Sequence, residues 1–75
     1  MKYYLDTIEQ IKEEGSYTEY GKREKKDDYQ AALVAFYDKL KNVSNSASHT
    51  WMDIKIVNSE GGIEKKDSIG KYIGE

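Results

Sequence analysis

Cysteine and proline are both absent from this 75-residue chain, and it contains a single histidine. Without cysteine there is no disulfide framework, no cysteine-ligated zinc site and no thiol nucleophile. The longest wholly apolar run, residues 31–37, is far shorter than a membrane span of about 20 residues. The first residues lead directly into an acidic, periodic segment without a secretory signal pattern, so we expect a cytoplasmic protein with no membrane partner.

An excess of one charge is also lacking, because 12 basic residues stand against 14 acidic ones and the net charge is −2. This balance provides no general attraction to nucleic acid or to a membrane surface. The frequent Lys, Ile, Tyr, Asn and Glu are typical of AT-rich genomes. We therefore expect a bacterium, a phage or another mobile element as the source.

The aromatic composition is unusual for so small a chain, with seven Tyr against one Phe and one Trp. Tyr supplies a large contact area, but its hydroxyl needs water or a hydrogen-bond partner. A domain of about 60 residues buries only about 60% of its unfolded surface, so residues 1–75 are expected to form one small domain. The predicted core aromatics are Tyr4, Tyr29, Phe36 and Tyr37, and those left for other contacts are Tyr17, Tyr20, Trp51 and Tyr72.

The first apolar residues recur at the i, i+3, i+4, i+7 spacing of an amphipathic helix: Met1, Tyr4, Leu5, Ile8 and Ile11. Gly15 is suited to a left-handed helix cap. Residues 16–28 allow several interpretations. A capping box at Ser16 favours a helix, residues 17–21 suit a turn or a short edge strand, and the charged residues 22–28 suggest a solvated linker or an exposed helical turn.

A second helix is predicted to begin after Asp27 or Asp28, either of which supplies an N-terminal cap. Its apolar stripe runs from Tyr29 to Val43, and the helix should end within residues 42–45. Three further apolar residues widen the stripe and predict burial of the central turns on more than one side: Ala31, Val34 and Ala35.

After residue 50 the apolar period changes from 3.6 to two, and the alternation of Met52, Ile54 and Ile56 predicts a half-buried strand. Residues 58–62 suit a hairpin turn, with residues 63–66 as the return strand. A final helical turn is predicted from the shared side of Ile69, Tyr72 and Ile73.

These elements predict an α+β fold in which two antiparallel helices pack on a C-terminal β-hairpin, in the order α-α-β-β with a short terminal helical turn. An isolated hairpin is marginally stable in water. A third strand, either from residues 17–21 or from a second copy of the chain, would therefore make physical sense.

Catalytic signals are weak in this sequence. His49 is predicted to lie exposed in a polar loop, although Ser44, Ser46 and Ser48 are close in sequence. A catalytic His49 would require a concave site with a carboxylate or a hydroxyl in reach. The acidic pairs lack the EF-hand ligand pattern, and Gly61-Gly62 lacks the P-loop spacing. We predict no catalytic residue, metal site, cofactor or small-molecule substrate, and hence no enzyme.

Two surfaces are candidates for binding. Aromatic and basic residues cluster as in proteins that bind single-stranded nucleic acid, although acids are interleaved with them: Tyr17, Tyr20, Lys22, Arg23, Lys25 and Lys26. Trp51 and Val57 should point away from the helices and form a protein interface with Tyr17, Tyr20 and Tyr72. Alternatively, Trp51 folds over the sheet edge or packs under the terminal helix with Tyr72.

The sequence therefore favours a small non-enzymatic protein-interaction module of the inhibitor, immunity or adaptor type, acting on a protein partner or as a homo-oligomer such as a homodimer. The alternative is a nucleic-acid-binding protein that uses residues 17–26.

Overall fold

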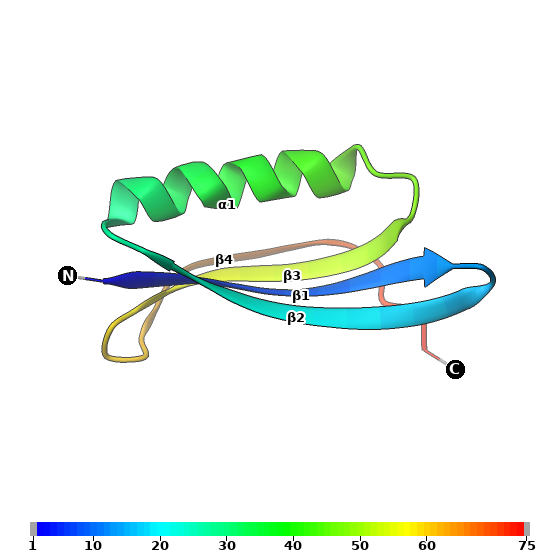
Figure 1. The fold of residues 1–75 in the computed structure, drawn as a ribbon, viewed down its shortest axis with the longest axis horizontal. Helices are drawn as coiled ribbons and strands as arrows, with labels where there is room; N and C mark the ends of the chain where they lie inside the picture. Colours follow the sequence, from blue (N-terminus) through cyan, green and yellow to red (C-terminus); the bar gives the residue numbers. More distant parts are fainter. Residues whose placement is uncertain (1, 75) are drawn as a thin grey trace.

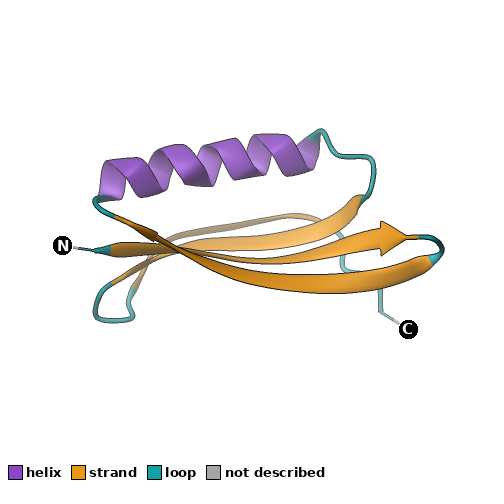
Figure 2. Ribbon diagram, viewed as in Figure 1, coloured by secondary structure: helices purple, strands orange, loops and turns teal. Residues whose placement is uncertain are grey.

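The computed structural model describes residues 2–74, which form one helix and a four-stranded antiparallel sheet (Figure 1). The elements, in chain order, are β1 (Tyr3–Glu13), β2 (Ser16–Lys26), α1 (Tyr29–Ser44), β3 (His49–Asn58) and β4 (Ile63–Gly70). The strand order is β2-β1-β3-β4, so β1 and β3 are central. Figure 2 shows α1 along one face of the sheet, which we call the inner face. The opposite face is called the open face.

The prediction of two helices on a hairpin is wrong, because the segment expected to form the first helix is the central strand β1. Its apolar residues match a helical spacing but divide between the two faces of a strand. Leu5 is buried against the inner-face core, whereas Ile8 lies on the open face and is half exposed. The strand period prevails because β1 hydrogen-bonds to β2 on one side and to β3 on the other.

β1 and β2 form a hairpin around a two-residue turn in which both residues have positive φ, 49° at Glu14 and 85° at Gly15. This pair of left-handed conformations is the one that matches the twist of the flanking strands. Gly15 is therefore left-handed as expected, but in a hairpin rather than at a helix end. The edge-strand interpretation of residues 17–21 is confirmed, and β2 extends through residues 22–26, for which the linker interpretation is wrong.

The helix α1 begins as predicted, with Asp28 as the N-terminal cap accepting a hydrogen bond from the Ala31 N–H at 2.8 Å. It ends at Ser44, within the predicted range. Burial is confined to one side, since Val34 and Tyr37 are each 54% exposed. The predictions of wider burial and of a core position for Tyr37 are wrong. Within residues 2–74, α1 lacks the length and the apolar character needed to cross a bilayer.

The core lies between α1 and the inner face of β1 and β3. The predicted alternation in β3 is confirmed, because Met52, Ile54 and Ile56 are all buried. Register pairs Ile56 with Leu5 in β1. The buried apolar cluster consists of Leu5, Ala32, Phe36, Val43, Met52, Ile54 and Ile56.

The second hairpin has the predicted turn, in which the Asn58 carboxamide oxygen accepts from the Glu60 and Gly62 N–H groups at 2.9 Å each. β4 continues beyond the predicted end at residue 66 to Gly70, so the predicted terminal helical turn is wrong. Gly70 has φ of 76°, and a Cβ there would collide with the Thr50 carbonyl oxygen. The chain turns at Gly70, and residues 71–74 pass across one end of the open face (Figure 1).

Candidate functional site

Within residues 2–74, the open face of the sheet has no covering element other than residues 71–74 at one end. Alternation along the two central strands places Tyr4, Asp6, Ile8 and Gln10 of β1 on this face, beside Val57, Lys55, Asp53 and Trp51 of β3. Odd-numbered residues of β2, from Tyr17 to Lys25, extend the face on the β1 side. The sheet thus combines apolar, aromatic and charged side chains on one surface.

Ile8 occupies the centre of the open face and is 47% exposed, although it lies on a central strand. Its register partner in β2 is Gly21, which has no side chain to cover it, and its partner in β3 is the carboxylate Asp53. A shallow depression of about 370 Å³ lies here, with Arg23 and Lys55 among its lining residues. The arrangement is an apolar centre with a charged rim.

The rim is ordered by a bidentate ion pair between Arg23 and Asp6, whose two nitrogen–oxygen distances are both 2.7 Å. The hydrogen bonds to Asp6 and its negative charge raise the pKa of Arg23. The same guanidinium lies over the Tyr4 ring, 4.7 Å from its centroid. Tyr4, predicted to be a core aromatic, is therefore a half-buried residue of the open face.

One end of the open face is covered by the C-terminal segment. Gln10 is only 2% exposed. Its carboxamide donates to the Ile73 carbonyl and accepts from the Ile73 N–H, both at 2.8 Å. The Trp51 and Tyr72 rings meet edge to face with centroids 5.2 Å apart. The predicted contact of Trp51 with Tyr72 is confirmed, but the terminal helix under which the pair was expected to pack does not form in residues 71–74.

The remaining predicted interface residues have different surroundings. Val57 lies on the open face but is only 5% exposed. Tyr17 lies on the open face and is 45% exposed. Tyr20 is equally exposed but points to the other side of β2, where its hydroxyl donates to Glu13 at 2.6 Å and the bond raises the pKa of Tyr20. The structure therefore brings Tyr17, Trp51 and Tyr72 together at one end of the open face, where Tyr17 and Tyr72 line the same cavity, and leaves Val57 and Tyr20 apart from them.

The predicted nucleic-acid cluster is likewise divided, because alternate residues of a strand point to opposite faces. Tyr17, Arg23 and Lys25 belong to the open face, whereas Tyr20, Lys22 and Lys26 belong to the other. Lys22 forms an ion pair with Glu24 at 3.4 Å.

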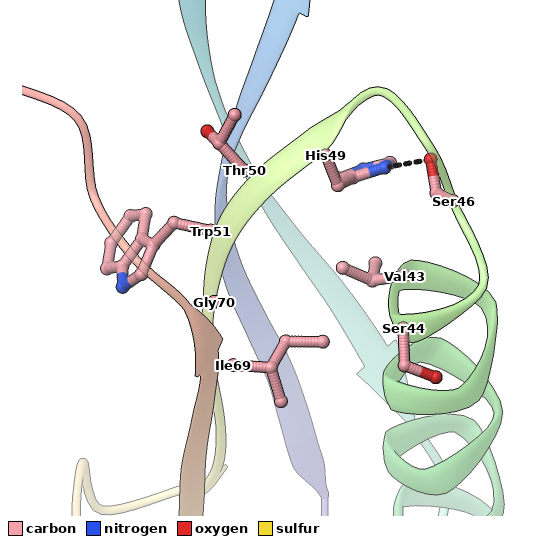
Figure 3. Close-up of a pocket in the computed structure, with 8 residues that line it drawn as sticks. All are labelled: Val43, Ser44, Ser46, His49, Thr50, Trp51, Ile69 and Gly70. Carbon is pink, nitrogen blue, oxygen red and sulfur yellow. Dashed lines mark hydrogen bonds between the residues drawn. The ribbon is translucent and has the colours of Figure 1, made fainter.

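His49 provides a second candidate site, at the start of β3 rather than in an exposed loop. Its side chain is 17% exposed, with Nε2 2.7 Å from a Glu9 carboxylate oxygen and Nδ1 2.8 Å from the Ser46 hydroxyl. Figure 3 shows the ring directed toward Ser46, beside a cavity of about 290 Å³ that Val43 and Ile69 help to line. The prediction of an exposed histidine is wrong, and a hydroxyl and a carboxylate are both in reach.

The surroundings of His49 nevertheless favour a structural role. The same Glu9 oxygen lies 3.0 Å from Lys39 Nζ, so an ammonium group already compensates the carboxylate that would stabilise a catalytic imidazolium. The Ser46 N–H donates to the Val43 carbonyl at 3.1 Å and is not free to stabilise an oxyanion. We interpret this group as a polar link that joins β1, α1 and the start of β3.

Sequence reasoning missed Ile8, Glu9 and Gln10 as site residues because it assigned their segment to a helix. The signal that identifies the strand is Glu14-Gly15, a two-residue turn between two runs of 11 residues each. When residues 3–13 are assigned the alternation of a strand, Ile8 falls on the opposite face from the core residue Leu5.

Comparisons of the chain with protein-family models, with curated proteins and with solved structures found no match in any of the three.

Proposed function

We propose that this chain is a small non-enzymatic protein-interaction module of the inhibitor, immunity or adaptor type, from a bacterium, a phage or another mobile element, and that it acts in the cytoplasm. Its binding surface is the open face of the sheet. The observation that carries this proposal is the 47% exposure of Ile8 at the centre of that face.

An interface commonly has an apolar centre that is sealed from water by a polar rim. Ile8 has this environment, because Gly21 leaves it uncovered and Asp6, Arg23 and Lys55 surround it. Covering an exposed apolar side chain contributes roughly 25 cal/mol per Å² of apolar surface removed from water. The ion pair between Arg23 and Asp6 holds part of the rim in place before a partner arrives.

The charge of the open face indicates the chemistry of the partner. Its bases outnumber its acids, although the chain as a whole has a net charge of −2. The bases are Lys12, Arg23, Lys25, Lys55 and Lys66, and the acids are Asp6, Glu19 and Asp53. Such a face is complementary to an acidic protein surface with an apolar side chain that contacts Ile8.

Nucleic acid is the weaker alternative because the two rings expected to stack on bases, Tyr17 and Tyr20, point to opposite faces of β2. Two other rings of the open face already have neighbours, since Arg23 covers the Tyr4 ring and Trp51 packs against Tyr72. Single-strand binding requires aromatic faces and a continuous basic path. The alternation of β2 divides that path between two faces.

The test compares Ile8→Glu with Val34→Glu, which changes a similarly exposed apolar residue on α1. Immobilised wild type and Val34→Glu are expected to retain an acidic partner from a bacterial extract, and Ile8→Glu to retain at least tenfold less, because it removes the apolar contact and adds a repulsive charge. Quantitative mass spectrometry measures retention, and circular dichroism checks that each variant is folded.

Equal retention by all three proteins would contradict the proposal. A short single-stranded oligonucleotide is tested in parallel. If it binds to the wild type with an affinity that falls steeply as salt is added, the nucleic-acid alternative replaces the protein partner.

A further inference from the structure

The long outer strand β2 has the properties of a self-pairing edge. We infer that two copies of this chain join through β2, antiparallel about Gly21, to form a homodimer with one continuous sheet. This interface is separate from the contact proposed for the open face.

β2 is an outer strand of the sheet, paired with β1 along one side. It has 11 residues, about twice the length of an ordinary strand, and its register with β1 is unbroken from Ser16 to Lys26. Natural proteins protect such edges with short strands, prolines, bulges or charges. Of these devices, β2 has only its charged side chains. The other edge strand, β4, is shorter and has an irregular register beside Val57.

The charges of β2 complement each other when the strand pairs with its own copy. Pairing about Gly21 aligns all 11 residues of β2, from Ser16 opposite Lys26 to Lys26 opposite Ser16. In this register Glu19 lies opposite Arg23 of the second copy, and this ion pair occurs twice. Opposite charges that face each other across strands stabilise a sheet.

The other rows of this register are also compatible. Tyr17 lies opposite Lys25 of the second copy and Tyr20 opposite Lys22, so each ring meets an ammonium group. Thr18 faces Glu24, and Ser16 faces Lys26. No residue meets a like charge.

Alternative registers fit less well. Side chains stay on their own faces only if the pairing shifts by an even number of residues. In a symmetric antiparallel pair, moving the centre by one residue shifts the pairing by two, so each residue of β2 can serve as the centre. Centring the pair on Lys22 places that residue opposite its own copy, and centring it on Glu24 does the same for Glu24 and sets Arg23 against Lys25. Centring it on Tyr20 shortens the ladder and leaves Glu19 opposite Gly21.

The resulting assembly has a simple geometry. The two-fold axis passes perpendicular to the sheet at Gly21, so both helices lie on one side and both open faces lie on the other. Arg23 keeps its contact with Asp6 and gains Glu19 of the second copy. The dimer therefore doubles the area of the open face without covering Ile8.

The test measures the monomer–dimer equilibrium by sedimentation at increasing concentration, from the 8.7 kDa monomer to twice that mass. Ser16 and Thr18 are each replaced once by a basic residue and once by an acidic residue. Thr18→Glu and Ser16→Lys place like charges opposite Glu24 and Lys26 and should raise the dissociation constant roughly fivefold. Thr18→Lys and Ser16→Glu place opposite charges there and should lower it by a similar factor.

A wild type that remains monomeric at millimolar concentration would overturn the homodimer. This outcome includes the possibility that the β2 edge pairs with a strand of a different protein instead of a second copy. Shifts of the same sign for Thr18→Glu and Thr18→Lys would overturn the register. Ile8→Glu should leave the dimer intact, because Ile8 lies on β1. Thr18 points away from the open face, so its variants should still bind the open-face partner. Loss of dimerisation and loss of partner binding are therefore measured separately, and failure of one proposal is distinguishable from failure of the other.

Discussion

At the scale of single residues, Glu9 is the clearest case of a local sequence that gives no indication of its role. It is 7% exposed. One of its carboxylate oxygens contacts two side chains from other elements, Lys39 Nζ of α1 at 3.0 Å and His49 Nε2 of β3 at 2.7 Å. Burial on its own raises the pKa of Glu9, but the hydrogen bonds from Lys39 and His49 outweigh it, and the pKa lies below its ordinary value of 4.5.

Because the pKa of Glu9 is lower in the folded state, the unfolded chain binds its proton more readily. The stabilisation is therefore complete above about pH 4.5 and is lost as the pH falls through the folded-state pKa. We expect Glu9→Gln to lose about 2 kcal/mol of unfolding free energy at pH 7 and to show a shallower decline in acid. Urea unfolding at pH 7, 5 and 3, followed by Trp51 fluorescence, measures this.

The matched control is Glu60→Gln in the exposed turn after β3, which should retain the acid dependence of the wild type. If Glu9→Gln declines in acid as steeply as the wild type, then Glu9 does not contribute in this way.

At the scale of elements, α1 shows how a helix can be predicted correctly while the width of its buried side is overestimated. Phe36 is completely buried, whereas Val34, two residues earlier, is 54% exposed. A single helix on a four-stranded sheet contacts the protein along one side, and the rest of its circumference faces solvent. The second helix that would have covered Val34 does not exist within residues 2–74, since that segment is β1.

Truncation of these two residues should therefore have unequal effects. Phe36→Ala removes a buried ring and leaves a cavity, which typically costs about 4 kcal/mol. Val34→Ala should change stability by less than about 0.5 kcal/mol, because the site is exposed. Thermal and urea unfolding monitored by circular dichroism compare them, and similar losses for the two variants would mean that α1 packs on the sheet through another side.

At the scale of the whole molecule, α1 covers one face of the sheet, and the proposed associations use two of the surfaces that it leaves uncovered. The open face presents Ile8, and the edge presents the charge pattern centred on Gly21. The proposed partner therefore approaches along the normal to the sheet, whereas the second copy approaches within the plane of the sheet.

Because Ile8 and Thr18 lie on different strands and opposite faces, their effects should be independent. The double variant Ile8→Glu/Thr18→Glu should bind the open-face partner as weakly as Ile8→Glu and dimerise as weakly as Thr18→Glu. Titration with the partner and sedimentation measure the two quantities separately. A double variant whose dimer is much weaker than that of Thr18→Glu would show that the open face takes part in dimerisation.

Much of the site was beyond prediction because its parts come from distant positions in the chain. The link between Glu9 and His49 spans 40 residues, and the contact between Gln10 and Ile73 spans 63. The exposure of Ile8 depends on Gly21, which faces it across the first hairpin. The aromatic and basic residues of β2 were recognised, but their division between two faces follows from the strand conformation.

The sequence by itself determined α1, its cap at Asp28, the alternation in β3 and the turn at residues 58–62, because capping and periodicity act within a few residues. Tertiary structure decided the identity of β1. Leu5 and Ile8 are three residues apart, a spacing that suits one face of a helix but opposite faces of a strand, so local periodicity favoured the wrong element. The choice fell to strand partners on both sides, because a strand completes its hydrogen bonds only with neighbours that the fold brings to it.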